Sequence, residues 1–254
     1  MEVQRLRLFI LWTAMALLGT TLAFAATIPL PPTEIVEGPT SSFDVANYGS
    51  MPVNATAGNI TQLVISGIGQ TKAWQGYYGN ITGSITLDDA NNFTFYNWSS
   101  AEPQGQIYAT LTNTVAWLSV DCLDYADLVV SEAYVEGYYG INSNHVDGIA
   151  ETFNQTDHPI FQVGSINMTA CPTTYIFQND LYQQSNYVNV LLWDTTNVVN
   201  GWIYTTLIEN KSVNSTNDLI CYNGEECDFQ IMVNENGHGT DTDPTTYYFW
   251  VELL

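Results

Sequence analysis

Nine asparagines have the type and spacing required for one chemical modification, the attachment of an N-linked glycan. Each stands in an Asn-x-Ser/Thr triplet without proline at the middle position, which is the acceptor pattern for that reaction. Because glycosylation of this kind takes place outside the cytoplasm, the triplets predict an exported protein with N-linked glycans on its surface. The acceptor asparagines are Asn54, Asn59, Asn80, Asn92, Asn97, Asn154, Asn167, Asn210 and Asn214.

Four cysteines, an even number, favour two disulfides in an exported chain. Three connectivities are possible. Cys221 and Cys227 enclose Asn223-Gly224, a tight-turn signal, so a local pair is favoured there. Cys122 would then pair with Cys171 by elimination. A structural zinc site is the alternative, but no Cys-x-x-Cys spacing is present and the histidines lie far apart in the sequence.

One loop near the C-terminus is a candidate calcium site. Residues 234–244 concentrate oxygen-bearing side chains and glycines, and Asp241 and Asp243 resemble the start of many calcium loops. The closing glutamate of the helix-flanked calcium loop is absent, so a plain hydrated loop is the alternative. Apart from this possible Ca²⁺, the sequence predicts no cofactor.

No sequence motif predicts catalysis. The chain has no Gly-x-Ser-x-Gly elbow, His-Glu-x-x-His helix, phosphate-binding loop or dinucleotide fingerprint. Asp121, Asp124 and Asp127 would cluster on one side of a helix, as the paired carboxylates of a glycosidase could, although a solvated acidic face is the ordinary explanation. We therefore expect a protein that is not an enzyme.

The charge balance is strongly acidic, with 26 Asp and Glu against four Lys and Arg and a net charge of −22. The unusual feature is the small number of Lys and Arg residues. Such a chain can displace few counterions from phosphate, which argues against nucleic-acid binding, and it is repelled by anionic membrane surfaces.

The first 25 residues have the pattern of a secretion signal. Two arginines precede an apolar run, and Ala23-Phe24-Ala25 supplies a small-x-small cleavage site. We expect cleavage after residue 25, a mature chain without membrane contact, and an extracellular or cell-surface location. An uncleaved anchor is the alternative, since residues 8–26 barely reach the length of a membrane span.

The mature chain divides into an extended N-terminal arm over residues 26–58 and a β-sandwich domain over residues 59–254. The arm contains proline, threonine and glycine and has little pattern. From Asn59 the pattern becomes typical of strands. Between residues 80 and 87, Ile81, Ile85 and Leu87 share one face and hydroxyl side chains the other.

The triplet at Asn92 repeats that alternation, which predicts Phe93 and Phe95 inside and Asn92 outside. The next triplet, beginning at Asn97, breaks the alternation, so the strand is predicted to end near it.

The remaining elements predict the fold class. A helical insertion is expected at about 115–153, with helix-like spacing over residues 121–133 and 146–153. Strands are expected at 187–193, 201–208, 229–233 and 247–254. The sequence therefore predicts a mainly β protein, an antiparallel β-sandwich with a small helical insertion in the middle and an extended N-terminal arm.

The last predicted strand is apolar on both faces. Tyr247, Phe249 and Val251 lie on one side, and Tyr248 and Trp250 lie on the other. A strand of this kind is buried on both faces, so we expect it to be central in its sheet or covered by another chain.

Two stretches resemble a family of secreted, N-glycosylated archaeal cell-surface proteins. The first is Trp74-Gln-Gly-Tyr-Tyr-Gly-Asn-Ile-Thr-Gly-Ser-Ile-Thr-Leu-Asp-Asp-Ala-Asn-Asn, and the second joins Cys227-Asp-Phe-Gln-Ile-Met-Val-Asn-Glu-Asn-Gly-His-Gly to Tyr247-Tyr-Phe-Trp-Val-Glu-Leu. The resemblance implies an archaeal cell-surface location and supplies no catalytic residues.

These features favour an extracellular structural protein, a glycosylated subunit of a filament or surface layer. The arm, at Thr27–Val36, could add a strand to the sheet edge of a neighbouring copy and so produce a head-to-tail polymer. A glycan-binding adhesin is the first alternative, because exposed aromatic side chains can stack on sugar rings. A secreted hydrolase that uses carboxylates is the second.

Overall fold

The computed structural model describes residues 28–42, 51–100, 104–123, 145–197, 200–208, 219–235 and 243–254. Within them the protein is mainly β and every strand pair is antiparallel, as predicted. The predicted signal peptide lies outside these residues. The strands are β1 (Trp74–Gly79), β2 (Gly83–Asp88), β3 (Thr94–Ser100), β4 (Gly105–Thr110), β5 (Val120–Cys122), β6 (Phe161–Val163), β7 (Ile166–Met168), β8 (Thr173–Gln178), β9 (Tyr182–Asp194), β10 (Trp202–Leu207), β11 (Phe229–Asn234) and β12 (Tyr248–Leu253).

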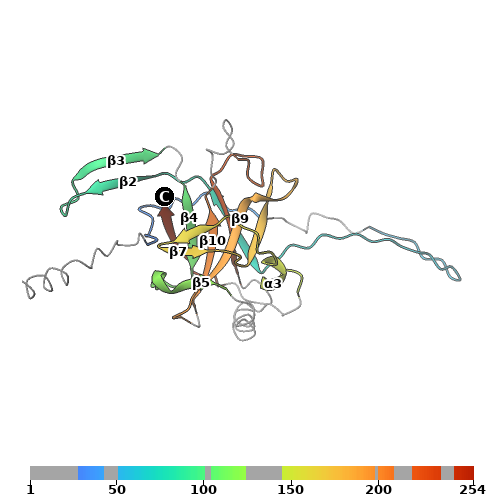
Figure 1. The fold of residues 1–254 in the computed structure, drawn as a ribbon. Helices are drawn as coiled ribbons and strands as arrows, with labels where there is room; N and C mark the ends of the chain where they lie inside the picture. Colours follow the sequence, from blue (N-terminus) through green and yellow to red (C-terminus); the bar gives the residue numbers. More distant parts are fainter. Residues whose placement is uncertain are drawn as a thin grey trace, which may run out of the picture.

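A six-stranded sheet forms the centre of the molecule (Figure 1). Its order is β12-β4-β10-β9-β5, and β8 pairs with β9 beside β5. Side chains alternate across this sheet, so that Trp202 and Tyr204 contribute to one apolar cluster and Ile203, between them, to another. Every residue of β4 is buried because both faces of the sheet are covered.

Two small antiparallel pairs supply those covers. The pair β1–β11 places Ile231 and Val233 against the face that contains Trp202 and Tyr204. On the opposite face, the pair β6–β7 packs in the cluster that contains Ile203, and Figure 1 shows β7 in front of β10. The fold is therefore a sandwich of three layers, with the large sheet in the middle.

A buried asparagine joins the central sheet to the β1–β11 layer. The Asn189 side chain on β9 accepts a hydrogen bond from the Met232 N–H (2.8 Å) and donates one to the Gln230 carbonyl (2.7 Å). The Thr206 hydroxyl on β10 donates to the same carbonyl (2.8 Å). These bonds satisfy backbone groups of β11 that face the sheet and are shielded from water.

The described helices are short: η2 (Trp117–Ser119) and α3 (Ile149–Thr152). The second lies inside the predicted helix at 146–153. The helix predicted from Asp121 is wrong at its start, because Val120–Cys122 pairs with β9 and this tertiary pairing overrides the local spacing. Residues 124–144 lie outside the described residues. No helix in the described part of the chain combines the length and apolar character needed to cross a membrane.

Two segments project from the sandwich in opposite directions (Figure 1). The hairpin β2–β3 extends from one side, and residues 51–72, drawn in blue-green, extend far beyond the other. The latter contain a turn at Ala57–Gly58 but no strand. The first strand thus begins at Trp74, later than the β pattern that we expected from Asn59, because residues 59–72 pair with no strand among the described residues.

The structure of the hairpin β2–β3 shows that a second prediction, on which side chains lie inside, is wrong. Phe93 and Phe95, expected inside, are 72% and 84% exposed. The strand also continues beyond Asn97 to Ser100, and the break in alternation reflects a shift in register between Leu87 and Asp88. A β-bulge of this kind inserts an extra residue and so changes the face on which the following residues lie.

The last strand is not central in its sheet, and its cover by another chain stays a prediction. Among the described strands, β12 is the terminal strand of the central sheet and pairs along its length with β4. Its own chain packs against part of each face, with Phe249 in one cluster and Trp250 in the other, and Tyr248 is 40% exposed.

Candidate assembly surfaces

The free edge of β12 is occupied by the N-terminal arm of the same chain. Leu30 and Val251 form an isolated antiparallel bridge in which the Leu30 N–H donates to the Val251 carbonyl (2.9 Å) and the Val251 N–H donates to the Leu30 carbonyl (2.8 Å). Pro29 is buried at this contact, whereas Leu30 is 61% exposed. Two backbone hydrogen bonds and the buried Pro29 therefore hold the described part of the arm at this edge.

Proline limits how far this pairing extends. Pro29, Pro31 and Pro32 have no N–H group to donate, so the arm cannot continue the ladder on either side of Leu30 as an ordinary strand would. Beyond the prolines, Ile35 and Val36 are 58% and 81% exposed. A sheet edge with a single bridge leaves backbone N–H and C=O groups that can pair with a further strand.

A buried carboxyl group lies on the same strand. Glu252 is 3% exposed, and its carboxylate accepts hydrogen bonds from the Tyr108 hydroxyl (2.9 Å) and the Gly164 N–H (3.0 Å). Burial raises the pKa of Glu252, and the two hydrogen bonds oppose that rise. Burial and the neighbouring Glu252 raise the pKa of Tyr108. The Glu252 side chain joins β12 to β4 and to the turn between β6 and β7.

All the predicted glycan acceptors that the structure describes are exposed. The seven are Asn54, Asn59, Asn80, Asn92, Asn97, Asn154 and Asn167. Asn210 and Asn214 lie outside the described residues. By contrast, the fully buried Asn189 and Asn234 do not stand in acceptor triplets. The triplets therefore lie where a glycan has room.

Both disulfides form with the predicted partners. Cys122, at the end of β5, is bonded to Cys171, which precedes β8. Cys221 is bonded to Cys227 across the short turn that contains Asn223. Because all four cysteines form disulfides, the zinc alternative is wrong. Two disulfides indicate a protein of an oxidising, non-cytoplasmic compartment.

The predicted calcium site lies only partly within the described residues. Asp243 precedes β12, and Asp241 lies outside the described part of the chain. Across the described ranges, no group of three or more His, Cys, Asp and Glu side chains has the proximity needed to hold a metal ion.

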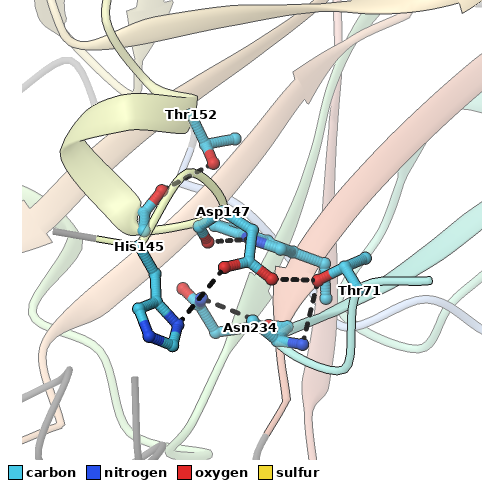
Figure 2. Close-up of polar contacts among 8 residues, drawn as sticks. Thr71, His145, Asp147, Thr152 and Asn234 are labelled. Atoms are coloured by element: carbon cyan, nitrogen blue, oxygen red, sulfur yellow. Dashed lines mark hydrogen bonds and ion pairs between the residues drawn. The ribbon is translucent and has the colours of Figure 1, made fainter. Parts of the chain in front are cut away.

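One polar cluster resembles a hydrolytic site in its residue types (Figure 2). Asp147 accepts a hydrogen bond from the Thr71 hydroxyl (2.7 Å), and its other oxygen lies 3.9 Å from His145 Nδ1. These groups are linked in the wrong order for nucleophilic catalysis, because the Thr71 hydroxyl donates its hydrogen to the Asp147 carboxylate and not to the His145 imidazole.

The cluster has a structural role instead. The Trp74 indole N–H donates to the Asp147 carbonyl (2.7 Å), and the Thr71 hydroxyl also accepts the Ala73 N–H (3.1 Å). These bonds attach the segment before α3 to the start of β1. Among the three aspartates proposed as a carboxylate cluster, Asp121 lies in β5, and Asp124 and Asp127 are outside the described residues.

Sequence reasoning named the arm and the last strand separately but missed their contact. A signal was present, because a leucine flanked by prolines can pair at only one position, and the doubly apolar last strand required covering layers on both faces.

Comparison with known proteins adds no further assignment: no family model, no curated protein and no solved structure matches this chain.

Proposed function

We propose that this protein is a glycosylated extracellular structural subunit of an archaeal filament or surface layer, assembled when the arm of one copy pairs with the β12 edge of the next. The observation that carries the proposal is the bridge between Leu30 and Val251. A segment that already pairs with its own sheet edge has the right chemistry to pair with the same edge of an identical chain.

Exchange of the arm requires little disruption of the monomer. Two backbone hydrogen bonds hold it, and such bonds contribute on the order of 1 kcal/mol each because water replaces them when they break. Ile35 and Val36, the exposed apolar residues of the arm, are 58% and 81% exposed in the monomer, so an assembly could bury them. A heterologous contact of this type propagates into a polymer if the rotation between copies does not close.

Three further features support an extracellular subunit. The described acceptor asparagines are all exposed, the disulfides suit an oxidising compartment, and the two sequence motifs resemble archaeal surface proteins. If residues 1–25 are removed, the net charge becomes −23, since two Arg and one Glu are lost from a chain of −22. Copies then repel one another, so assembly should require salt or divalent cations.

The experiment changes the donor group alone. Leu30→Pro removes the N–H that donates to Val251, and deletion of residues 26–40 removes the whole donor. We expect both chains to fold and neither to form polymers of ordinary length in electron micrographs of protein from cells that export it. Ser41→Pro, at an exposed arm position beyond the donor, is the control and should polymerise normally. Polymers of ordinary length from both altered chains would refute arm exchange.

A glycan-binding adhesin is the second candidate, because Tyr96 and Trp98 are 55% and 54% exposed with ring centroids 4.6 Å apart on the hairpin. Neighbouring exposed rings can stack on sugars. Retention of wild-type monomers, but not of Trp98→Ala monomers, on a polysaccharide column would favour the adhesin.

A further inference from the structure

The hairpin β2–β3 has one apolar face that the described part of its chain leaves about half exposed. Ile85 lies opposite Trp98 and Leu87 lies opposite Tyr96, so these four side chains share a face. They are between 42% and 55% exposed. Thr86 pairs with Asn97 on the other, polar face, so a glycan on Asn97 would point away from the apolar side.

The second projecting segment, residues 51–72, also exposes apolar side chains. Residues 60–68 contain five large apolar side chains, which are 54% to 102% exposed: Ile60, Leu63, Val64, Ile65 and Ile68. Their β-branched composition favours a strand, yet the segment forms none in this chain. A β-prone apolar segment without a partner strand is stabilised when it meets another apolar surface.

Charge restricts where two copies can approach. The chain carries −22 overall, but no charged residue occurs between Asp44 and Lys72. On the hairpin, the charged side chains within 83–98 are Asp88 and Asp89, near its turn. These neutral surfaces can meet without bringing like charges together, and Lys72 beside one of them complements the aspartates of the other.

From these observations we infer that residues 60–68 of one copy dock on the apolar face of the β2–β3 hairpin of a second copy. The two surfaces project in opposite directions (Figure 1), so a chain's own loop does not cover its own hairpin. The contact is therefore heterologous and adds copies head to tail. It rests on the proposed role of the chain as a self-associating subunit, but it uses none of the arm.

The test isolates this contact from arm exchange by using the full mature chain with Leu30→Pro. Ile65→Lys alters the loop and Trp98→Glu alters the hairpin, both at exposed positions where the fold is not disturbed. Association is measured by sedimentation velocity over a range of concentrations. Met51→Lys, at a residue 90% exposed in the same loop but outside the docking segment, is the control.

We expect the Leu30→Pro parent and the Met51→Lys control to associate equally, and the association constant of each docking variant to fall at least about tenfold, since each places a charge in an apolar contact. An equimolar mixture of the two variants should restore association. The intact loop of the Trp98→Glu chain meets the intact hairpin of the Ile65→Lys chain, and the reverse contact, which joins two introduced charges of opposite sign, is not needed for this.

Three results would overturn the inference. They are a monomeric parent at every concentration, unchanged association of either docking variant, and a mixture that remains monomeric. Binding of monomers to a polysaccharide that Trp98→Glu abolishes and Ile65→Lys preserves would assign the hairpin face to a sugar instead. Loss of arm exchange alone leaves the sedimentation result unchanged, so failure of the proposed function and failure of this contact are distinguishable.

Discussion

Strands β10 and β3 share the spacing of a tryptophan and a tyrosine but have different surroundings. Both place tryptophan and tyrosine two residues apart, Trp202 with Tyr204 and Tyr96 with Trp98, in antiparallel pairs. Yet Trp202 is 1% exposed and Trp98 is 54% exposed. The difference is the layer above each pair, because β1–β11 covers β10 and nothing in the described chain covers the hairpin face. Aromatic alternation therefore predicts a strand, and the neighbouring layers decide whether it is core or surface.

Removing the same side chain from the two regions should give the largest contrast. Trp202→Ala leaves a large cavity in the apolar cluster around Leu191, which we expect to lower the free energy of unfolding by about 3–5 kcal/mol. Trp98→Ala removes an exposed ring and should change it by less than about 1 kcal/mol. Chemical denaturation of the monomeric protein measures both.

Trp202→Phe serves as the control, because the indole N–H of Trp202 is buried and has no hydrogen-bond partner among the described residues. A smaller ring without that donor should cost clearly less than alanine. Equal losses for Trp98→Ala and Trp202→Ala would show that the hairpin face is covered in the monomer.

A second contrast uses asparagines. Asn189→Ala leaves the Met232 N–H and the Gln230 carbonyl without one of their partners between two layers, and we expect a loss of about 1–3 kcal/mol in the free energy of unfolding. Asn97→Ala, in an exposed acceptor triplet, should stay within about 0.5 kcal/mol in protein that carries no glycan. Urea denaturation compares them, and a similar loss at both positions would contradict a structural role for Asn189.

Much of the fold could be predicted from local pattern. The expected strands at 187–193, 201–208 and 229–233 are confirmed because apolar runs with β-branched residues are the main sequence signal of buried strands. β4 was missed, since Gly105, Gln106 and Thr110 interrupt its apolar character. Gly105 has a φ of 135° and lies directly against the Glu252 backbone, where a side chain would collide. That requirement comes from packing across strands and cannot be inferred from neighbours in the sequence.

Among the features of the candidate surfaces, the disulfides could be predicted from the sequence, whereas the arm contact and the exposed phenylalanines could not. The Cys221–Cys227 pair followed from turn chemistry, which is local in the sequence, and the distant pair Cys122–Cys171 followed by elimination. The pairing of Leu30 with Val251 joins residues at opposite ends of the chain. The flanking prolines restrict where the arm can pair, but the sequence does not identify the partner strand. The exposure of Phe93 and Phe95 was unpredictable for the same reason, because it depends on a covering layer and not on the strand itself.

The smallest expected effect concerns pH and the buried carboxyl group of Glu252, which contrasts with exposed acids. Burial raises its pKa in the folded state above the ordinary value for glutamate. Between the two values the folded chain holds a proton that the unfolded chain has lost, so stability falls as pH rises through this window. Below the unfolded pKa the full contribution is present, and above the folded pKa it is lost.

Glu252→Gln should remove this term while keeping the shape of the side chain and hydrogen bonds to Tyr108 and Gly164. The free energy of unfolding of the wild type minus that of Glu252→Gln is then expected to decrease from acidic to neutral pH, as measured by urea denaturation in steps of pH. Taking the difference cancels the acids common to both chains. Glu226→Gln, at an exposed position, changes the net charge equally and controls for general repulsion. A difference that rises with pH would mean that the hydrogen bonds from Tyr108 and Gly164 stabilise the carboxylate more than burial disfavours it, and the edge strand would then be held by a charged group.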